Sequence, residues 1–341
     1  MTRIAMLAVW VVTIVSALAL AAEGPRSIGS IERLDPGLDK LIAPGTKIEL
    51  LAQGHDWAEG PVWVPGGKFL LYSDIPPNSI FRWKEGQGAS LWLKPSGYTG
   101  PSSRGGEPGS NGLALDPQGR LVLCQHGDRR VARLDASLDN PEPKFITLAD
   151  RYEGKRLNSP NDLVFHPNGD LYFTDPPYGL EKNVHDPAKE LDFQGVYRLS
   201  KDGKLTLLTR EMSRPNGIAL SPDAKTLYVA NSDPHKAVWM AFDLKPDGTI
   251  GAGRVLFDAT HWVGRQRPGL PDGMAIDEAG NIFATGPGGV LVLSPAGDLL
   301  GRIDTTQATA NCTFGGEDRS ELYITADMYL LRVKTKTKGL R

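Results

Sequence analysis

Short apolar runs, each introduced by the same turn-forming phrase, recur along most of the chain. In the clearest copy, residues 111–119 read Asn-Gly-Leu-Ala-Leu-Asp-Pro-Gln-Gly, and a strand-type run follows at 121–124. Apolar runs bounded by Gly and Pro turn signals are typical of β-strands. Each copy opens on a residue whose side chain carries a carboxylate or carboxamide oxygen. The six openings are Glu59, Asn111, Asn161, Asn216, Asp272 and Asn311.

The spacing of the copies predicts a β-propeller. Successive copies open 52, 50, 55, 56 and 39 residues after the one before, as the residue numbers give. An all-β sequence that repeats itself every 40 to 55 residues or so is typical of propeller blades. The sixth repeat lacks a fourth strand, whereas the alternating stretch 46–53 precedes the first repeat. We therefore predict one six-bladed propeller over 46–341, closed by an N-terminal strand that completes the last blade.

Three inserts interrupt the repeats, at 95–110, 150–160 and 259–271. Each insert runs directly into a repeat opening, so we expect all three to gather at one face of the ring. Loops on a rigid scaffold are the usual carriers of function. Trp262, in the last insert, is therefore a candidate wall of a pocket.

The N-terminus is predicted to be a processing segment. Arg3 precedes a continuous apolar stretch at 4–20, and small residues at 19–21 suit a cleavage site. The stretch is near the lower length limit for a transmembrane anchor, which is the competing interpretation. No positive flank follows it, which favours a signal peptide of residues 1–22. The mature protein would then be exported, to a periplasm or the exterior, with 23–45 as an N-terminal extension on the surface.

Composition narrows the partners. The 39 Gly and 26 Pro suit many tight turns, and a net charge of −2 argues against nucleic acid or an anionic membrane surface as a binding partner.

Cys124 and Cys312 fall in repeats two and six, which a six-fold ring does not make neighbours. We predict two buried free thiols, although an exported compartment would permit a disulfide. No nucleophile elbow, P-loop or dinucleotide fingerprint is present, so neither a serine hydrolase nor an organic cofactor is indicated.

The repeat openings are the candidate chemistry. In a propeller the first strand of each blade lines the central channel, so these residues should meet at its mouth. Two carboxylates, Glu59 and Asp272, together with amide oxygens form the ligand set that Ca²⁺ prefers, since softer metals favour His or Cys. The competing interpretation is that they are only turn formers, as Asn-Gly and Asp-Gly often are. Glu59-Gly60-Pro61 is a poor turn former in the same slot, which favours a site.

Several segments resemble one known family. They are 59–63 (Glu-Gly-Pro-Val-Trp), 173–180 (Phe-Thr-Asp-Pro-Pro-Tyr-Gly-Leu), 215–217 (Pro-Asn-Gly), 271–277 (Pro-Asp-Gly-Met-Ala-Ile-Asp) and 311–316 (Asn-Cys-Thr-Phe-Gly-Gly). From about residue 46 to the end, the chain resembles the gluconolactonases, regucalcin (senescence marker protein) and related lactonases, most closely the bacterial gluconolactonase branch. The resemblance implies a six-bladed propeller that hydrolyses sugar lactones with one divalent ion, usually Ca²⁺. It implies metal ligands at Glu59, Asn161, Asn216 and Asp272.

The resemblance also implies a mechanism, with Asp272 as the general base. The ion would polarise the lactone carbonyl and stabilise the oxyanion while Asp272 takes a proton from water. A nucleophilic Asp272 stays open. Asn111, His126 and Arg156 are the expected substrate contacts. The regucalcin branch has an Arg two residues before the third-repeat Asn, whereas this chain has Ser159 there.

Two other functions stay open at this stage. One is a different ester or phosphotriester hydrolase on the same metal. The other is a non-catalytic ligand-binding propeller with a structural Ca²⁺, because propellers serve many functions. Mg²⁺, Mn²⁺ and Zn²⁺ are alternatives to Ca²⁺, and gluconolactone, another aldonolactone and a non-sugar lactone all fit as substrate. We expect a monomer with a small-molecule substrate.

Overall fold

The computed structural model describes residues 26–264 and 266–340. The predicted signal peptide at 1–22 lies outside these residues. Within them, no helix has the length and hydropathy needed to cross a bilayer. The described chain is almost entirely β-structure, with one short helix, α1 (Leu38–Leu41), and two 3₁₀ turns, η1 (Asn183–His185) and η2 (Thr260–Trp262). The prediction of an all-β protein is confirmed.

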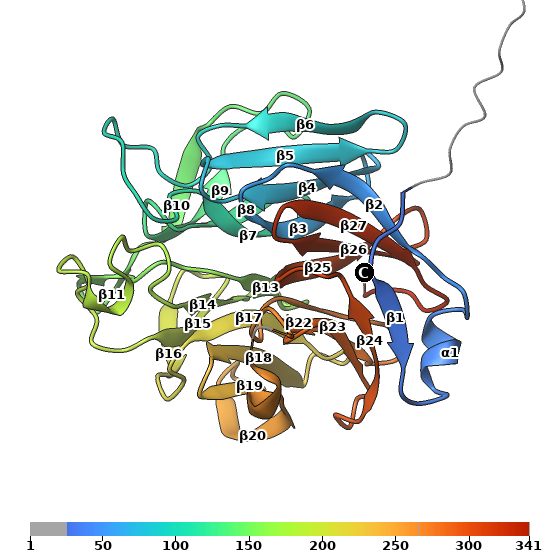
Figure 1. Cartoon of the computed structure of the whole chain (residues 1–341). Helices are drawn as coiled ribbons and strands as arrows, with labels where there is room; N and C mark the ends of the chain where they lie inside the picture. The colour runs from blue at the N-terminus through green and yellow to red at the C-terminus, as the bar shows by residue number, and fades with distance from the viewer. Residues whose placement is uncertain (1–25, 265, 341) are drawn as a thin grey trace, which may run out of the picture.

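Six antiparallel sheets form the blades and follow one another in chain order (Figure 1). The first is β3 (Ala58–Val64), β4 (Phe69–Asp74), β5 (Ser79–Lys84) and β6 (Gly88–Leu93), and the second is β7 (Ser110–Leu115), β8 (Leu121–Gln125), β9 (Arg130–Leu134) and β10 (Phe145–Ala149). The third is β13 (Leu163–Phe165), β14 (Leu171–Asp175), β15 (Gly195–Leu199) and β16 (Leu205–Thr209), and the fourth is β17 (Pro215–Leu220), β18 (Thr226–Asp233), β19 (Lys236–Leu244) and β20 (Ile250–Asp258). The fifth contains β21 (Met274–Ile276), β22 (Ile282–Gly286), β23 (Gly289–Leu293) and β24 (Leu299–Asp304), and the sixth contains β25 (Thr309–Gly315), β26 (Glu321–Ala326) and β27 (Tyr329–Lys334).

The first strands of the blades form a closed inner ring. Each contacts the first strand of the next blade, and β25 of the last blade contacts β3 of the first. The N-terminal strand β2 (Ile48–Gln53) pairs antiparallel with β27, with Ile48 opposite Val333, so it supplies the fourth strand of the sixth blade. The predicted six-bladed propeller and its N-terminal closure are confirmed. Closure pairs the outer edge of β27, which the three C-terminal strands of this blade would otherwise leave open.

The segment before β2 is more ordered than its polar composition indicates. Its strand β1 (Ser30–Arg33) pairs with β24 as a fifth strand of the fifth blade, as Figure 1 shows. Leu38 and Ile42 are fully buried against the fifth and sixth blades. The extension therefore ties the first residues described to the last two blades.

The hydrophobic core lies between neighbouring blades. Cys124 packs with Phe173 between the second and third blades, and Cys312 packs with Phe283 between the fifth and sixth. Both thiols are buried and free, as predicted. Packing between blades keeps the channel mouth rigid, because each first strand is held by two neighbouring sheets.

Candidate active site at the channel mouth

A cavity of about 690 Å³ opens at the mouth of the channel. Five of the six repeat openings line it: Glu59, Asn111, Asn161, Asn216 and Asp272. These five residues are spread over more than two hundred residues of chain. They meet because each lies within the first two residues of the first strand of its blade, or, for Asn161 and Asp272, two residues before it. We call these five the oxygen ring.

Local backbone geometry turns the ring residues toward the axis. The pairing of the first two strands shifts register after Glu59 in β3, after Ser110 in β7 and after Pro215 in β17. Such a bulge re-aims side chains at the end of a strand. The glycine that follows four of the six openings has a steric reason as well. A Cβ on Gly60 would lie 2.0 Å from the carbonyl oxygen of Asn111, and one on Gly217 would lie 2.1 Å from that of Asp272.

The Asn-Gly and Asp-Gly pairs are therefore more than turn formers. Glycine lets the backbones of neighbouring blades meet at the channel. The third repeat departs from the pattern because Asp162 occupies the glycine slot. Its carboxylate accepts hydrogen bonds from Leu163 N at 2.9 Å and from Ile218 N at 3.3 Å. Sequence reasoning missed Asp162, although the replaced glycine was a readable signal.

Four ring oxygens are buried without a hydrogen-bond partner among the described residues: Oδ1 of Asn111, Asn161, Asn216 and Asp272. Buried polar atoms are normally paired, so four orphans in one cavity need a cause. Asn311, the sixth opening, is different, since its Oδ1 accepts a hydrogen bond from Cys312 N at 2.8 Å. In the described part of the chain, no three His, Cys, Asp or Glu side chains form a metal-binding group. Amides supply most of the ring.

The cavity is strongly acidic. Burial raises the pKa of Asp272 well above its ordinary value, and the charges of Glu59, Asp162 and Glu107 raise it further. Burial also raises the pKa of Glu59, against a hydrogen bond from Gly60 N. These carboxylates repel one another where water screens them poorly. Arg214 is the one basic side chain among the described residues that line the cavity.

Without a bound cation, we expect the protein to lose stability as the pH rises from about 5 to about 8. Burial raises the folded-state pKa of Asp162 to about 6 and that of Asp175 to about 7, and it shifts Glu59 and Asp272 in the same direction. A carboxyl group whose pKa is raised by folding stabilises the fold fully below its unfolded-state pKa. That contribution is lost as the pH rises through the folded-state value.

Urea unfolding in chelator at several pH values measures this dependence. Asp175→Asn should flatten the fall between about pH 4 and about pH 7, the interval between the unfolded-state and folded-state pKa values of the carboxyl group. A free energy of unfolding that rises over this range would contradict the prediction.

Residues at the ends of the second strands hold the segments that lead into the ring. Asp74 accepts a hydrogen bond from Trp57 N at 3.0 Å, and Asn231 accepts one from Arg214 N at 2.9 Å. In the third blade, Asp175 accepts one from Asn158 N at 2.8 Å. In the structure these three residues fix the backbone two or three residues before a ring residue.

The remaining candidate residues, His126, Arg156 and Trp262, do not line the channel cavity. His126 is fully buried at the end of β8 and does not line the cavity. Arg156, on the short strand β12 (Lys155–Arg156), donates from Nη2 to the carbonyl oxygen of Asp128 at 2.7 Å and does not line it either. The substrate contacts expected of these two residues stay predictions. Trp262 lines a neighbouring hollow, where Arg267 lies 4.7 Å from its ring, and not the channel cavity.

Three lining residues were missed in the sequence. Arg214 lies over the ring of Tyr178 at 5.9 Å, and burial raises the pKa of Tyr178 to about 12. Arg214 is two residues before Asn216, a position that could have drawn attention to it. Glu107, in the insert that enters Asn111, is the third.

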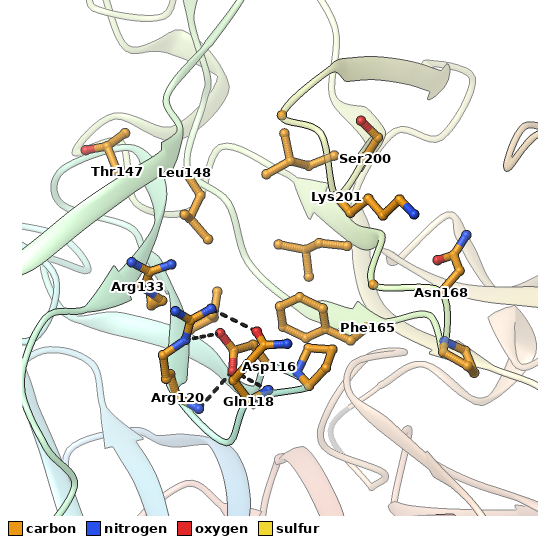
Figure 2. Close-up of a pocket in the computed structure, with 17 residues that line it drawn as sticks. Asp116, Gln118, Arg120, Arg133, Thr147, Leu148, Phe165, Asn168, Ser200 and Lys201 are labelled. Atoms are coloured by element: carbon orange, nitrogen blue, oxygen red, sulfur yellow. Dashed lines mark hydrogen bonds and ion pairs between the residues drawn. The ribbon is translucent and has the colours of Figure 1, made fainter.

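A second cleft, of about 560 Å³, lies at the opposite ends of the first strands of the second and third blades (Figure 2). It contains none of the ring residues. Its acidic residue, Asp116, is already bound to Arg120, with Oδ2 and Nε 2.7 Å apart, as the dashed lines in Figure 2 show. Among the described residues that line it, this cleft therefore offers no unpaired carboxylate.

Fold and site together define a six-bladed propeller with an acidic, oxygen-lined cavity at the mouth of its channel. The chain belongs to the SMP-30/Gluconolactonase/LRE-like family, whose model matches residues 57–327. It is 42% identical to a gluconolactonase of Zymomonas mobilis over 318 residues, which are 92% of this chain and 88% of that protein.

Solved structures agree. A gluconolactonase from Xanthomonas campestris has 31% sequence identity and a TM-score of 0.76, covering 91% of this chain and 96% of that one. Regucalcin from Agrobacterium tumefaciens, a calcium-binding protein, shares the fold at 20% identity with a TM-score of 0.66, covering 85% and 94%.

Proposed function

We propose that this protein hydrolyses sugar lactones in the channel cavity with the help of one divalent cation, for which Ca²⁺ is the first candidate. The proposed ligands are Glu59, Asn161, Asn216 and Asp272. A lactone-hydrolysing enzyme is the class that similarity to the Zymomonas mobilis and Xanthomonas campestris gluconolactonases supports. The observation that carries the metal is the set of buried ring oxygens without hydrogen-bond partners. Export by way of residues 1–22 is part of the proposal, supported by the apolar stretch and its small-residue site.

The residues present fit a hard cation. Carboxylate and amide oxygens are the ligands of Ca²⁺, and the two carboxylates Glu59 and Asp272 match its charge. Orphaned Oδ1 atoms on Asn161, Asn216 and Asp272 would each gain a partner. A cation would also relieve the repulsion that raises the pKa of both carboxyl groups.

When bound, the ion supplies Lewis-acid polarisation of the lactone carbonyl and charge stabilisation of the oxyanion. The protein supplies the rest. Asp272 lines the cavity and is placed to take a proton from the attacking water as general base. Asn111, whose Oδ1 is also unpartnered, and Arg214 face the cavity, where they can bind and orient the hydroxyl groups of the substrate.

The test is hydrolysis of D-glucono-δ-lactone and other aldonolactones by the purified mature protein. A pH-indicator assay would be run after chelation and again after Ca²⁺ is restored, with spontaneous hydrolysis subtracted. We expect turnover only with the ion present. Absence of turnover on every lactone, with Ca²⁺ still bound, would sink the lactonase proposal and favour a ligand-binding propeller.

A further inference from the structure

Glu107, a carboxylate of the insert that enters Asn111, has no role in the chemistry above. It lines the cavity together with Asp272, and 39% of its side chain is exposed. Its Oε2 lies 3.1 Å from Nδ1 of His126, outside the alignment of a directional hydrogen bond. The pair therefore joins a group that substrate can reach to one that it cannot.

His126 is an unusual buried imidazole. Its side chain has no exposed surface, and neither ring nitrogen has a hydrogen-bond partner among the described residues. Its backbone is fixed, since His126 N donates to the carbonyl oxygen of Gly109 at 3.1 Å. Gly179 packs so closely against it that an added Cβ would lie 2.5 Å from Cβ of His126. Burying an imidazole without hydrogen bonds costs free energy, so its place beside Glu107 calls for an explanation.

The insert holds Glu107 on a fixed platform. Arg104 donates from Nη1 to the carbonyl oxygen of Gly127 at 2.7 Å and from Nη2 to that of Gly179. Its guanidinium also lies over the ring of Tyr98 at 5.5 Å. At the other end of the insert, Gly109 N donates to the carbonyl oxygen of Ile75 at 3.0 Å. Glu107 therefore lies between two anchored points, as a catalytic group needs.

Lactone hydrolysis also requires a proton on the departing ring oxygen, and Asp272, as the general base, does not supply it. When the ring C–O bond breaks, its electron pair goes to an alkoxide oxygen, which is a poor leaving group unless it is protonated as it departs. A positioned carboxyl group or imidazole can supply that proton.

We propose that Glu107 is a catalytic residue that protonates the departing ring oxygen, and that His126 is a positioning residue that holds Glu107 in place. The inference rests on the proposed lactonase function. In the proposed step the Glu107 carboxyl group carries the proton, with Nδ1 of His126 3.1 Å from its Oε2. As the ring C–O bond breaks, the proton passes from the Glu107 carboxyl group to the ring oxygen. Solvent then returns a proton to the pair, and the proton taken from water by Asp272 leaves to solvent, so the turnover balances.

Two substrates separate this role from a structural one. D-Glucono-δ-lactone releases an alkoxide, whereas dihydrocoumarin releases a phenoxide that departs without help. Glu107→Gln should lower kcat on the first by about 10²-fold with little change in KM, and leave the second close to wild type. His126→Asn should show the same selectivity, and Glu107→Asp should regain part of the lost activity. Glu181→Gln is the matched control, because Glu181 pairs with Arg104 but lies outside the cavity.

Calcium binding by each variant, measured by calorimetry, should fall far less than in Glu59→Gln, since Glu107 is outside the proposed ligand set and acts on Asp272 only through its charge. Equal losses on both substrates, or no loss on either, would overturn the inference and leave the lactonase function standing. If wild type does not accept dihydrocoumarin, a Glu107→Gln defect confined to KM, or a Glu107→Asp variant no better than Glu107→Gln, overturns it. A wild-type protein inactive on all lactones would overturn the proposed function, and this inference with it.

Discussion

Asp272→Asn is expected to lower turnover of D-glucono-δ-lactone by about 10³-fold, because the variant loses the proposed base and one anionic ligand together. The substitution keeps the shape of the side chain, so the loss should not come from misfolding. In chelator the variant should be more stable than wild type at pH 8, since a neutral amide does not repel Glu59, Asp162 and Glu107, whose charges act on Asp272.

Initial rates by pH indicator and thermal unfolding by calorimetry measure the two effects. Asp298→Asn, in an exposed turn of the same blade, is the matched control and should change neither. Full turnover by Asp272→Asn with Ca²⁺ bound would rule out both a base and a nucleophile at this position. An acyl adduct on Asp272, found by mass spectrometry after acid quench, would assign it as nucleophile.

The propeller could be predicted from sequence because its determinants are local and repeated. Each blade repeats the same opening residue, turn and apolar run. Comparison of the six repeats within the one chain therefore reveals the pattern without any second sequence. The closing strand could also be predicted, since 46–53 alternates like a strand without a repeat of its own. β1 could not, because a four-residue strand carries too little pattern to select its partner β24.

The oxygen ring could be predicted from sequence for the same reason. The parts of the site that could not be predicted have physical causes. Position in a repeat fixes where a backbone lies but not where an amide turns. Asn311 stands in the same slot as Asn216, yet its Oδ1 is taken by Cys312 N. Arg156 could not be placed because its side chain is long and its partner, Asp128, belongs to another blade. Glu107 was hidden because insert loops are shaped by tertiary contacts such as those of Arg104.

Removal of Ca²⁺ should abolish hydrolysis and lower the melting temperature by several degrees at pH 8. A ligand at a hundred times its Kd stabilises the folded state by about 2.7 kcal/mol, and the ion also relieves carboxylates that repel one another. Glu59→Gln removes one of the two ligand charges while leaving a side chain of the same size. It should therefore weaken Ca²⁺ binding by about 10²-fold and lose most of the calcium-dependent shift.

These measurements distinguish a structural role of the ion from a catalytic one. Glu317→Gln, whose carboxylate is exposed on the surface, is the control and should keep both the shift and the activity. If chelation lowers the melting temperature of wild type but leaves turnover intact, the ion is structural and the carbonyl is activated by protein groups alone. If Glu59→Gln binds Ca²⁺ as wild type does, Glu59 is not a ligand. The raised pKa of its carboxyl group would then reflect burial beside Asp162 and not a role as a metal ligand.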